Sequence, residues 1–172
     1  MDDHPAFTEL FERHAKAIWN YAYRLTASWT AADDLLSDAF LVAWRRRGEV
    51  RLVRDSALPW LYTVAGNICR DERRRTRRFL RVAPQLVAQD VEPDHADAIA
   101  EDSATRHQLS EVVDAIGRLP KAEREAARVC LLGGVSTSDA AALFGISEVS
   151  VRSRLSRARS RLHTILEEHP DA

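Results

Sequence analysis

The chain has 172 residues, of which 45% are hydrophobic and 30% charged, and its formal net charge is -1. That length suits one ordinary domain or two small helical ones. No apolar run reaches the roughly 18 to 20 residues that cross a bilayer, and the acidic start at Met1–Pro5 lacks the basic and apolar regions of a signal peptide. We therefore expect a cytoplasmic protein.

The two cysteines, Cys69 and Cys130, lie far apart in the sequence, each within an apolar helical pattern. They form neither a CxxC redox pair nor a local zinc site, and we interpret both as buried thiols. The sequence also lacks a phosphate-binding glycine loop, a nucleophile–base arrangement and paired metal-binding carboxylates. We therefore expect no metal, no cofactor and no enzymatic activity.

Charge is distributed unevenly along the chain. Arginines cluster over residues 70–81 and again over residues 152–161, and acidic residues gather between them, over residues 90–102. Because charge asymmetry is typical of nucleic-acid-binding proteins, the near-neutral sum hides two basic modules joined by an acidic connector.

The N-terminal half predicts three helices. Apolar residues recur at helical spacing over residues 7–25 and again over residues 33–47. Gly48 ends the second pattern, a loop is expected up to Ser56, and a third helix opens at Leu58 and continues into the first arginine cluster. Residues 83–106 then combine prolines, acids and small residues, which predicts a flexible acidic linker.

The C-terminal part predicts a helix-turn-helix. An apolar stripe over residues 109–119 precedes a helix that starts at Pro120 and ends before two glycines. Ser136 has capping-box-like spacing to Asp139, and Ser147 is placed to cap the next helix. No strand pattern competes, so the sequence predicts an all-α fold of two small helical domains, residues 1–82 and 107–172, joined by the linker.

The last predicted helix has an apolar stripe and, opposite it, a polar face. Arginine and serine on such a face suit the bases and phosphates of duplex DNA. A solvated basic helix without a ligand is the alternative. The residues that we expect to contact the duplex are Arg152, Ser153, Arg154, Ser156, Arg157, Arg159 and Ser160.

The third predicted helix carries a second polar face. Trp60 begins its core side, while Thr63, Asn67, Arg70 and Arg74 share another side on a helical wheel. Two DNA-binding faces on one small chain indicate a protein that grips two elements of one site. For residues 73–78 the alternative is a solvated helix end, because basic residues suit helix C-termini.

Three segments together resemble the extracytoplasmic-function, or group 4, sigma factors of bacteria: residues 33–44 (DDLLSDAFLVAW), 59–67 (PWLYTVAGN) and 151–159 (VRSRLSRAR). The match covers nearly the whole chain, in order and at the family's spacing. The resemblance implies two helical domains, sigma region 2 and sigma region 4. The first docks on core RNA polymerase and captures the melted minus-ten strand, and the second reads the minus-thirty-five duplex.

The resemblance also implies site residues. The loop over residues 49–56 is then the pocket for an extruded base. For the helix over residues 33–47, which would dock on polymerase, the alternative is that its carboxylates are simply solvated. On the third helix, Trp60 is assigned to the core, whereas Tyr62 lies off the core stripe. Asp71 is interpreted as pairing with Arg74 or Arg75. Contacts to the polymerase β′ clamp helices fall on Asp34, Ser37, Asp38, Leu41 and Arg45, and contacts to minus-ten DNA fall on Asn67, Thr63, Arg70, Arg74 and Tyr62.

The implied partners are core RNA polymerase, through its β′ and β subunits, promoter DNA, and an anti-sigma factor of the kind that often inhibits family members. Two residues depart from the family's common pattern: Ser37 replaces a frequent glutamine, and Gly66 stands where a bulkier, often basic, residue is usual. The linker is either an extension into the polymerase channels or an ordinary tether. The competing function is a stand-alone helix-turn-helix regulator, which would not explain the docking helix or the polar face around Asn67 in the first domain.

Overall fold

The computed structural model describes residues 4–82 and 100–168, and the regular elements in those ranges are helices. The all-α prediction is therefore confirmed. In chain order the elements are α1 (His4–Thr26), α2 (Trp29–Arg45), η1 (Arg47–Glu49), α3 (Leu58–Val82), α4 (Ala100–Arg118), α5 (Lys121–Ala126), η2 (Ala127–Leu132), α6 (Thr137–Phe144) and α7 (Glu148–Glu167).

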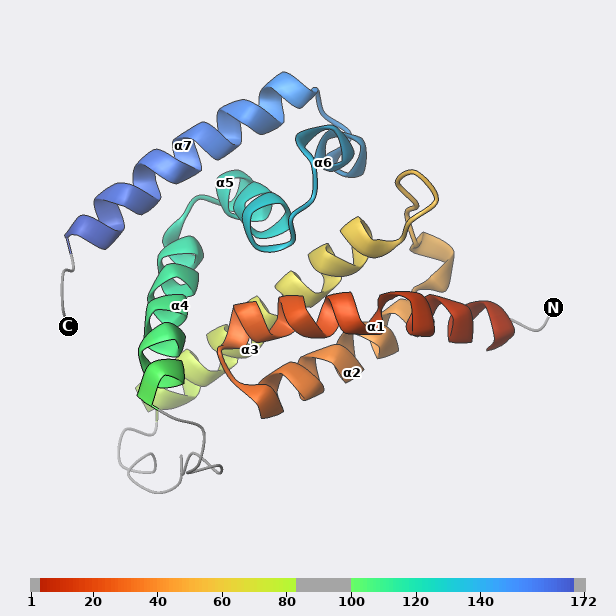
Figure 1. The fold of residues 1–172 in the computed structure, drawn as a ribbon, viewed down its shortest axis with the longest axis horizontal. Helices are drawn as coiled ribbons and strands as arrows, with labels where there is room; N and C mark the ends of the chain where they lie inside the picture. The colour runs from red at the N-terminus through yellow and green to blue at the C-terminus, as the bar shows by residue number, and fades with distance from the viewer. Residues whose placement is uncertain (1–3, 83–99, 169–172) are drawn as a thin grey trace.

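Helices α1, α2 and α3 form the first helical unit, in which each helix contacts the other two and α3 passes behind α1 (Figure 1). Its centre is apolar, because Ile18, Tyr21 and Leu25 of α1 and Leu61 of α3 are completely buried. Burial of such side chains stabilises a fold by roughly 1.5–3 kcal/mol each. This core fixes one side of α2 and of α3 and leaves their other sides available for binding.

The boundaries of two predicted segments differ from expectation. Helix α2 begins at Trp29 rather than near residue 33, because the Ser28 side chain caps it by accepting a hydrogen bond from the Ala31 backbone N–H, 3.3 Å away. Helix α4 begins at Ala100, so the last residues of the expected linker are helical. The remainder of that linker, residues 83–99, lies outside the described residues.

Helices α4 to α7 and η2 form the second helical unit. In Figure 1 the long helix α7 extends along one side of this unit, and it contacts α4, α5 and α6. The predicted apolar stripe is its inner side, since Val151, Leu155, Ala158 and Leu162 are all at most 9% exposed. The helix-turn-helix is therefore held together by burial of one face of α7, which leaves the opposite face in solvent.

The predicted turn chemistry of the helix-turn-helix is confirmed. The Ser136 side chain accepts a hydrogen bond from the Asp139 N–H at 3.0 Å, and Ser147 accepts one from the Ser150 N–H at 3.2 Å. Gly145 ends α6 with a φ of 66°, a left-handed conformation that glycine adopts without strain. These caps set the angle at which α7 leaves α6.

The two helical units also pack against each other. The contact joins α1 and α3 to α4, η2 and α6. At its centre is Arg128 of η2, which is only 6% exposed and donates from Nη1 to the carbonyl oxygen of Gly66 on α3, 3.0 Å away. The described helices thus share one continuous buried cluster. No helix in the described ranges is long and apolar enough to span a membrane.

Candidate nucleic-acid interface

The seven residues predicted to contact duplex DNA lie on α7, on the sides away from its buried stripe. Arg154 is half-buried, whereas the other six side chains are exposed. The helix begins with its capped N-terminus and places one arginine or serine after another along a single solvent-facing surface. We call this surface the α7 face: Arg152, Ser153, Arg154, Ser156, Arg157, Arg159 and Ser160.

Neighbouring carboxylates hold two of these arginines in place. Arg152 Nη2 lies 2.9 Å from Glu148 Oε1, one turn earlier on α7. The Thr137 hydroxyl of α6 donates to the same carboxylate oxygen at 2.7 Å, and this bond, together with the nearby Arg152, lowers the pKa of Glu148. Glu148 is therefore ionised at neutral pH and orients Arg152 while tying α6 to α7.

The second carboxylate, Glu123 of α5, did not emerge from sequence reasoning. Its side chain is 8% exposed, and its oxygens lie 3.5 Å from Arg157 Nε and 3.0 Å from Arg161 Nε. A buried carboxylate requires such cationic partners. Nothing in the spacing within α5 signals this contact, because both arginines come from another helix more than thirty residues later in the chain.

Val149 is a further residue of this surface that the sequence reasoning omitted. It is 71% exposed at the first turn of α7, one turn before Ser153 on the polar side of the helix. An exposed apolar side chain beside polar contacts suits the methyl group of thymine in the major groove. The available signal was its position on the wheel, off the apolar stripe of α7.

The second predicted face comprises Thr63, Asn67, Arg70 and Arg74 of α3, and we call it the α3 face. The second helical unit lies against part of it, whereas Arg74 is exposed. Thr63 and Asn67 are half-buried and line a cavity of only about 10 Å³ together with Glu125, Arg128 and Val129. That volume is far below the size of a nucleotide base. The two side chains are thus close together, but a base has no room beside Asn67 in this arrangement, whereas Thr63 also lines a larger cavity beside η1.

Tyr62 is likewise enclosed between the two units. It is 4% exposed, its ring centroid lies 4.4 Å from that of Tyr21, and a Cβ added to Gly133 would come within 2.8 Å of its ring. Gly66 is enclosed in the same way, because a Cβ there would lie 3.3 Å from Tyr21 Oη and 3.5 Å from Arg128 Cδ. The departure from the family's bulkier residue at position 66 therefore matches a close contact between the units.

The arginines after Asn67 also turn toward the second unit. Asp71, expected to pair with Arg74 or Arg75, instead lies 3.2 Å from Arg70 Nη2, so that prediction is wrong. Arg74 does not pair with Asp71 because its side chain lines a pocket together with Arg124 and Arg128 of the second unit.

The loop predicted to receive an extruded base borders a cavity of about 520 Å³. Residues of η1 and the following loop form one wall, Trp60 and Thr63 of α3 form the floor, and Phe144 of α6 closes the other side. Trp60 is 8% exposed and belongs to the core, as expected. Arg54 in this loop reaches α6, with its Nε 2.9 Å from Asp139 Oδ1.

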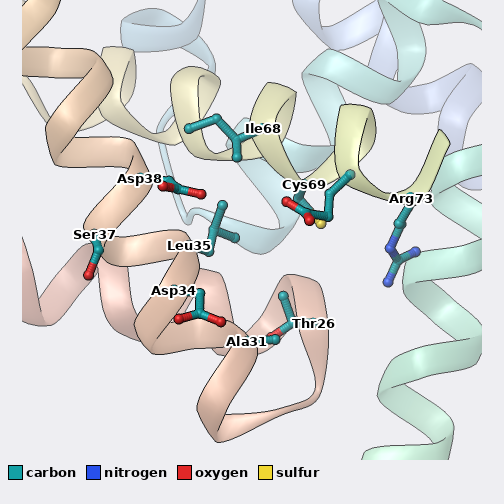
Figure 2. Close-up of a pocket in the computed structure, with 10 residues that line it drawn as sticks. Thr26, Ala31, Asp34, Leu35, Ser37, Asp38, Ile68, Cys69 and Arg73 are labelled. Atoms are coloured by element: carbon teal, nitrogen blue, oxygen red, sulfur yellow. The ribbon is translucent and has the colours of Figure 1, made fainter. Parts of the chain in front are cut away.

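The predicted docking surface lies along a groove between α2 and α3. Figure 2 shows Asp34 and Asp38 on α2 opposite Ile68 and Cys69 on α3, around a cavity of about 560 Å³. Both carboxylates are exposed, and within the described residues no cation forms an ion pair with either of them. The groove is therefore open to a partner that supplies positive charge.

The remaining predicted docking residues differ in their placement. Ser37 borders the groove, although its hydroxyl donates to the Asp33 carbonyl of its own helix at 3.0 Å. Leu41, 45% exposed, and Arg45 follow along α2 beyond the groove lining. The five residues thus share the outward side of α2, with an exposed leucine among polar groups.

Both cysteines are free thiols in the structure. Cys69 is buried and borders the groove, whereas Cys130 is half-buried, so the predicted burial holds fully for the first and partly for the second. Burial raises the pKa of each thiol. Within residues 4–82 and 100–168, no three His, Cys, Asp or Glu side chains gather as a metal site would require.

Two family profiles match the chain, one for each helical unit. Sigma-70 region 2 matches residues 10–79, and sigma-70 region 4 matches residues 109–162. The first match contains the docking groove and the α3 face, and the second contains the whole helix-turn-helix with the α7 face.

Similar proteins match nearly the whole chain. The ECF RNA polymerase sigma factors SigM and SigL of Mycobacterium tuberculosis are 34% and 33% identical to the chain; the matches cover 95% and 92% of this chain and 79% and 88% of theirs. The solved structure of the sigma factor CnrH in complex with the cytosolic domain of CnrY is 26% identical. It superposes with a TM-score of 0.60 over 98% of this chain and 92% of that one. The chain belongs to the extracytoplasmic-function family of RNA polymerase sigma factors.

Proposed function

We propose that the chain binds core RNA polymerase and directs it to promoters, with the α7 face reading the minus-thirty-five duplex and the α3 face capturing the melted minus-ten strand. The observation that carries this proposal is the coexistence, on one chain, of a capped helix-turn-helix with an exposed arginine–serine face and an open acidic groove on a separate unit. The chain supplies recognition, and the polymerase supplies the chemistry. Such a protein acts in the cytoplasm, where polymerase meets the chromosome.

The α2 groove suits docking on the β′ clamp helices of polymerase. Asp34 and Asp38 present unpaired carboxylates at its rim, and Leu41 adds an exposed apolar contact further along the helix. Complementary charge accelerates association and fixes orientation, while buried apolar contact at the centre supplies much of the affinity. A partner helix with arginine or lysine beside apolar side chains fits this surface.

The α7 face suits the major groove of duplex DNA. Arg152 and Arg157 are held by Glu148 and Glu123, so both guanidiniums are oriented before DNA arrives. Arginine can donate two parallel hydrogen bonds to guanine, and Val149 can contact a thymine methyl group. The outer arginines at positions 154 and 159 are placed to neutralise phosphates.

Capture of the minus-ten strand requires the two helical units to separate. Asn67 borders a cavity too small for a base, so a base cannot lie beside Asn67 while the two units are packed together, although Thr63 also lines the larger cavity beside η1. Two ion pairs that join the units, Arg73–Asp114 and Arg54–Asp139, are partly solvent-exposed and contribute on the order of 1 kcal/mol or less each. Separation also breaks the buried Arg128–Gly66 hydrogen bond and exposes apolar surface that the units share, so binding of polymerase has to supply more than these two ion pairs cost.

A protein inhibitor is a further proposed partner. The solved structure of RpoE from Bartonella quintana, 25% identical with a TM-score of 0.57, contains the anti-sigma factor NepR, and the CnrH structure contains the cytosolic domain of CnrY. By analogy, an anti-sigma protein that covers the α2 groove of this chain would block polymerase docking. A stand-alone helix-turn-helix regulator is not favoured, because it gives that groove no partner.

The proposal is tested by asking whether the chain joins core polymerase. Purified chain and core polymerase are mixed and separated by size-exclusion chromatography, and the polymerase fraction is then tested for binding to labelled promoter duplexes. We expect co-elution and sequence-dependent DNA binding by the complex. Duplex binding by the chain alone, without any co-elution, would instead establish the stand-alone regulator.

A further inference from the structure

Six arginines from both helical units surround one pocket of about 250 Å³. Four of them, Arg70, Arg73, Arg74 and Arg77, follow one another on α3 at helical spacing, and the others come from α5 and η2. Gly117, at the end of α4, completes the described lining, which contains no carboxylate. The full set of arginines is Arg70, Arg73, Arg74, Arg77, Arg124 and Arg128.

Most of this positive charge has no ion-pair partner within residues 4–82 and 100–168. Arg73 pairs with Asp114 at 2.8 Å and Arg70 with Asp71 at 3.2 Å. Within the described residues, no ion pair involves Arg74, Arg77, Arg124 or Arg128. Four arginines therefore line a small cavity without an ionic partner among the described residues, although Arg124 and Arg128 each donate from Nη1 to backbone carbonyl oxygens.

Two of these guanidiniums are also left with unused donors in the interior. The Nε atoms of Arg124 and Arg128 are buried and have no hydrogen-bond partner in the part of the chain that the structure describes, and Arg128 as a residue is only 6% exposed. Burial, together with the nearby Arg124 and Arg70, lowers the pKa of Arg128 even though Tyr21 and Cys69 oppose the shift. Bringing the two helical units together thus concentrates like charges, which an anion in the pocket would relieve.

We propose that this pocket is a binding site for a compact, multiply charged phosphate anion, such as an oligophosphate, held between α3 and α5–η2. Guanidinium groups bind phosphate oxygens through paired, charge-assisted hydrogen bonds, and several of them around one anion match its geometry as well as its charge. A cavity of about 250 Å³ has room for linked phosphoryl groups but not for a duplex.

Such a ligand would stabilise the closed packing of the two units. Since the site takes residues from both units, the anion binds the closed arrangement more tightly than a separated one, and by linkage it opposes separation. The pocket shares Arg70 and Arg74 with the α3 face, so its effect on promoter capture rests on the proposed function. The binding itself is measured without polymerase or DNA and stands or falls independently.

The test is calorimetric titration of the full chain with inorganic pyrophosphate at constant ionic strength. The key comparison is between two double variants. Arg74→Gln/Arg77→Gln changes the pocket, and the matched control Arg75→Gln/Arg78→Gln removes the same charge from exposed positions outside the pocket. Because charge-assisted bonds are lost, we expect the first variant to bind about tenfold or more weakly than wild type and the control about twofold weakly at most. Equal weakening in both variants would show a diffuse basic surface and overturn the proposal.

A second comparison tests whether both units form the site. Arg124→Gln removes a pocket arginine of α5, and Arg118→Gln removes an exposed arginine outside the pocket. We expect weaker pyrophosphate binding only for Arg124→Gln, with circular dichroism confirming that both variants fold. Equal affinities would confine binding to α3 and refute the bridging site. A short oligothymidylate that binds with the same dependence on Arg124 would identify the pocket as part of a nucleic-acid track and also overturn the proposal.

Discussion

Replacing Glu123 by glutamine removes the carboxylate that pairs with Arg157 and Arg161 of α7 while preserving the size of the side chain. Glu123 lies 3.0 Å from Arg161 Nε and 3.5 Å from Arg157 Nε, and its own side chain is 8% exposed. The variant therefore tests whether α5 anchors α7 electrostatically. We expect it to be less stable than wild type.

The size of this effect follows from the exposure of the partners. The side chains of Arg157 and Arg161 are 58% and 57% exposed, so solvent screens each pair, and each contributes roughly 1 kcal/mol or less. Because Glu123 itself is buried, solvent does not screen the two ion pairs completely. We therefore expect their joint loss to lower the free energy of unfolding by about 1–2 kcal/mol. For a chain of this length, about 2–4 °C accompanies each kcal/mol, which gives a decrease in Tm of about 2–8 °C.

Thermal unfolding followed by circular dichroism measures the change. Glu125→Gln is the matched control, because it removes the same charge two residues away, and within the described residues no ion pair involves Glu125. High salt should reduce the difference between the two variants only in part, since Glu123 is buried. The same Tm for both variants would refute the anchoring role of Glu123.

The remaining predictions concern the two binding surfaces and the core. Arg152→Ala/Arg157→Ala should weaken minus-thirty-five duplex binding by roughly 10- to 100-fold in anisotropy titrations while leaving polymerase association unchanged, and equal duplex affinity would rule out the α7 face. Asp34→Lys/Asp38→Lys should weaken association with core polymerase by about tenfold or more without loss of helicity, and unchanged co-elution would contradict the docking groove. Burial, aided by Arg13, lowers the pKa of His14, so folding holds this residue neutral. Stability should therefore be steady above about pH 6.5 and fall below it, His14→Gln should reduce that fall in Tm, and an identical pH profile would contradict this assignment.

Much of the fold could be predicted from the sequence by rules that involve only neighbouring residues, namely helix capping, turn formation and apolar periodicity. Ser136, Gly145 and Ser147 specify their caps and turn through their own side chains or backbone freedom, so the helix-turn-helix follows from short-range chemistry. The buried stripe of α7 follows from periodicity alone. Helix starts were less exact at Trp29 and Ala100, because a cap or an extra turn adds residues without any apolar signal.

The contact between the two helical units could not be predicted from those short-range rules. Arg128 is buried against the carbonyl of Gly66, and arginine is among the residues least expected inside a protein. Tyr62 lies off the core stripe of its own helix, and the second unit, at Gly133, completes the burial that Tyr21 of α1 begins. Such features arise from contacts between residues more than sixty positions apart, which periodicity within one helix cannot reveal.

Run-off transcription tests the central claim most directly. Core polymerase, with and without the chain, is supplied with a library of promoter fragments, and the transcripts are sequenced to locate their start sites. The account predicts discrete transcripts that require the chain and share sequence elements upstream of the start, and predicts that both the α7-face and the groove variants reduce them. Transcript levels no higher than those of core polymerase alone would contradict the assignment of this chain as a promoter-directing subunit.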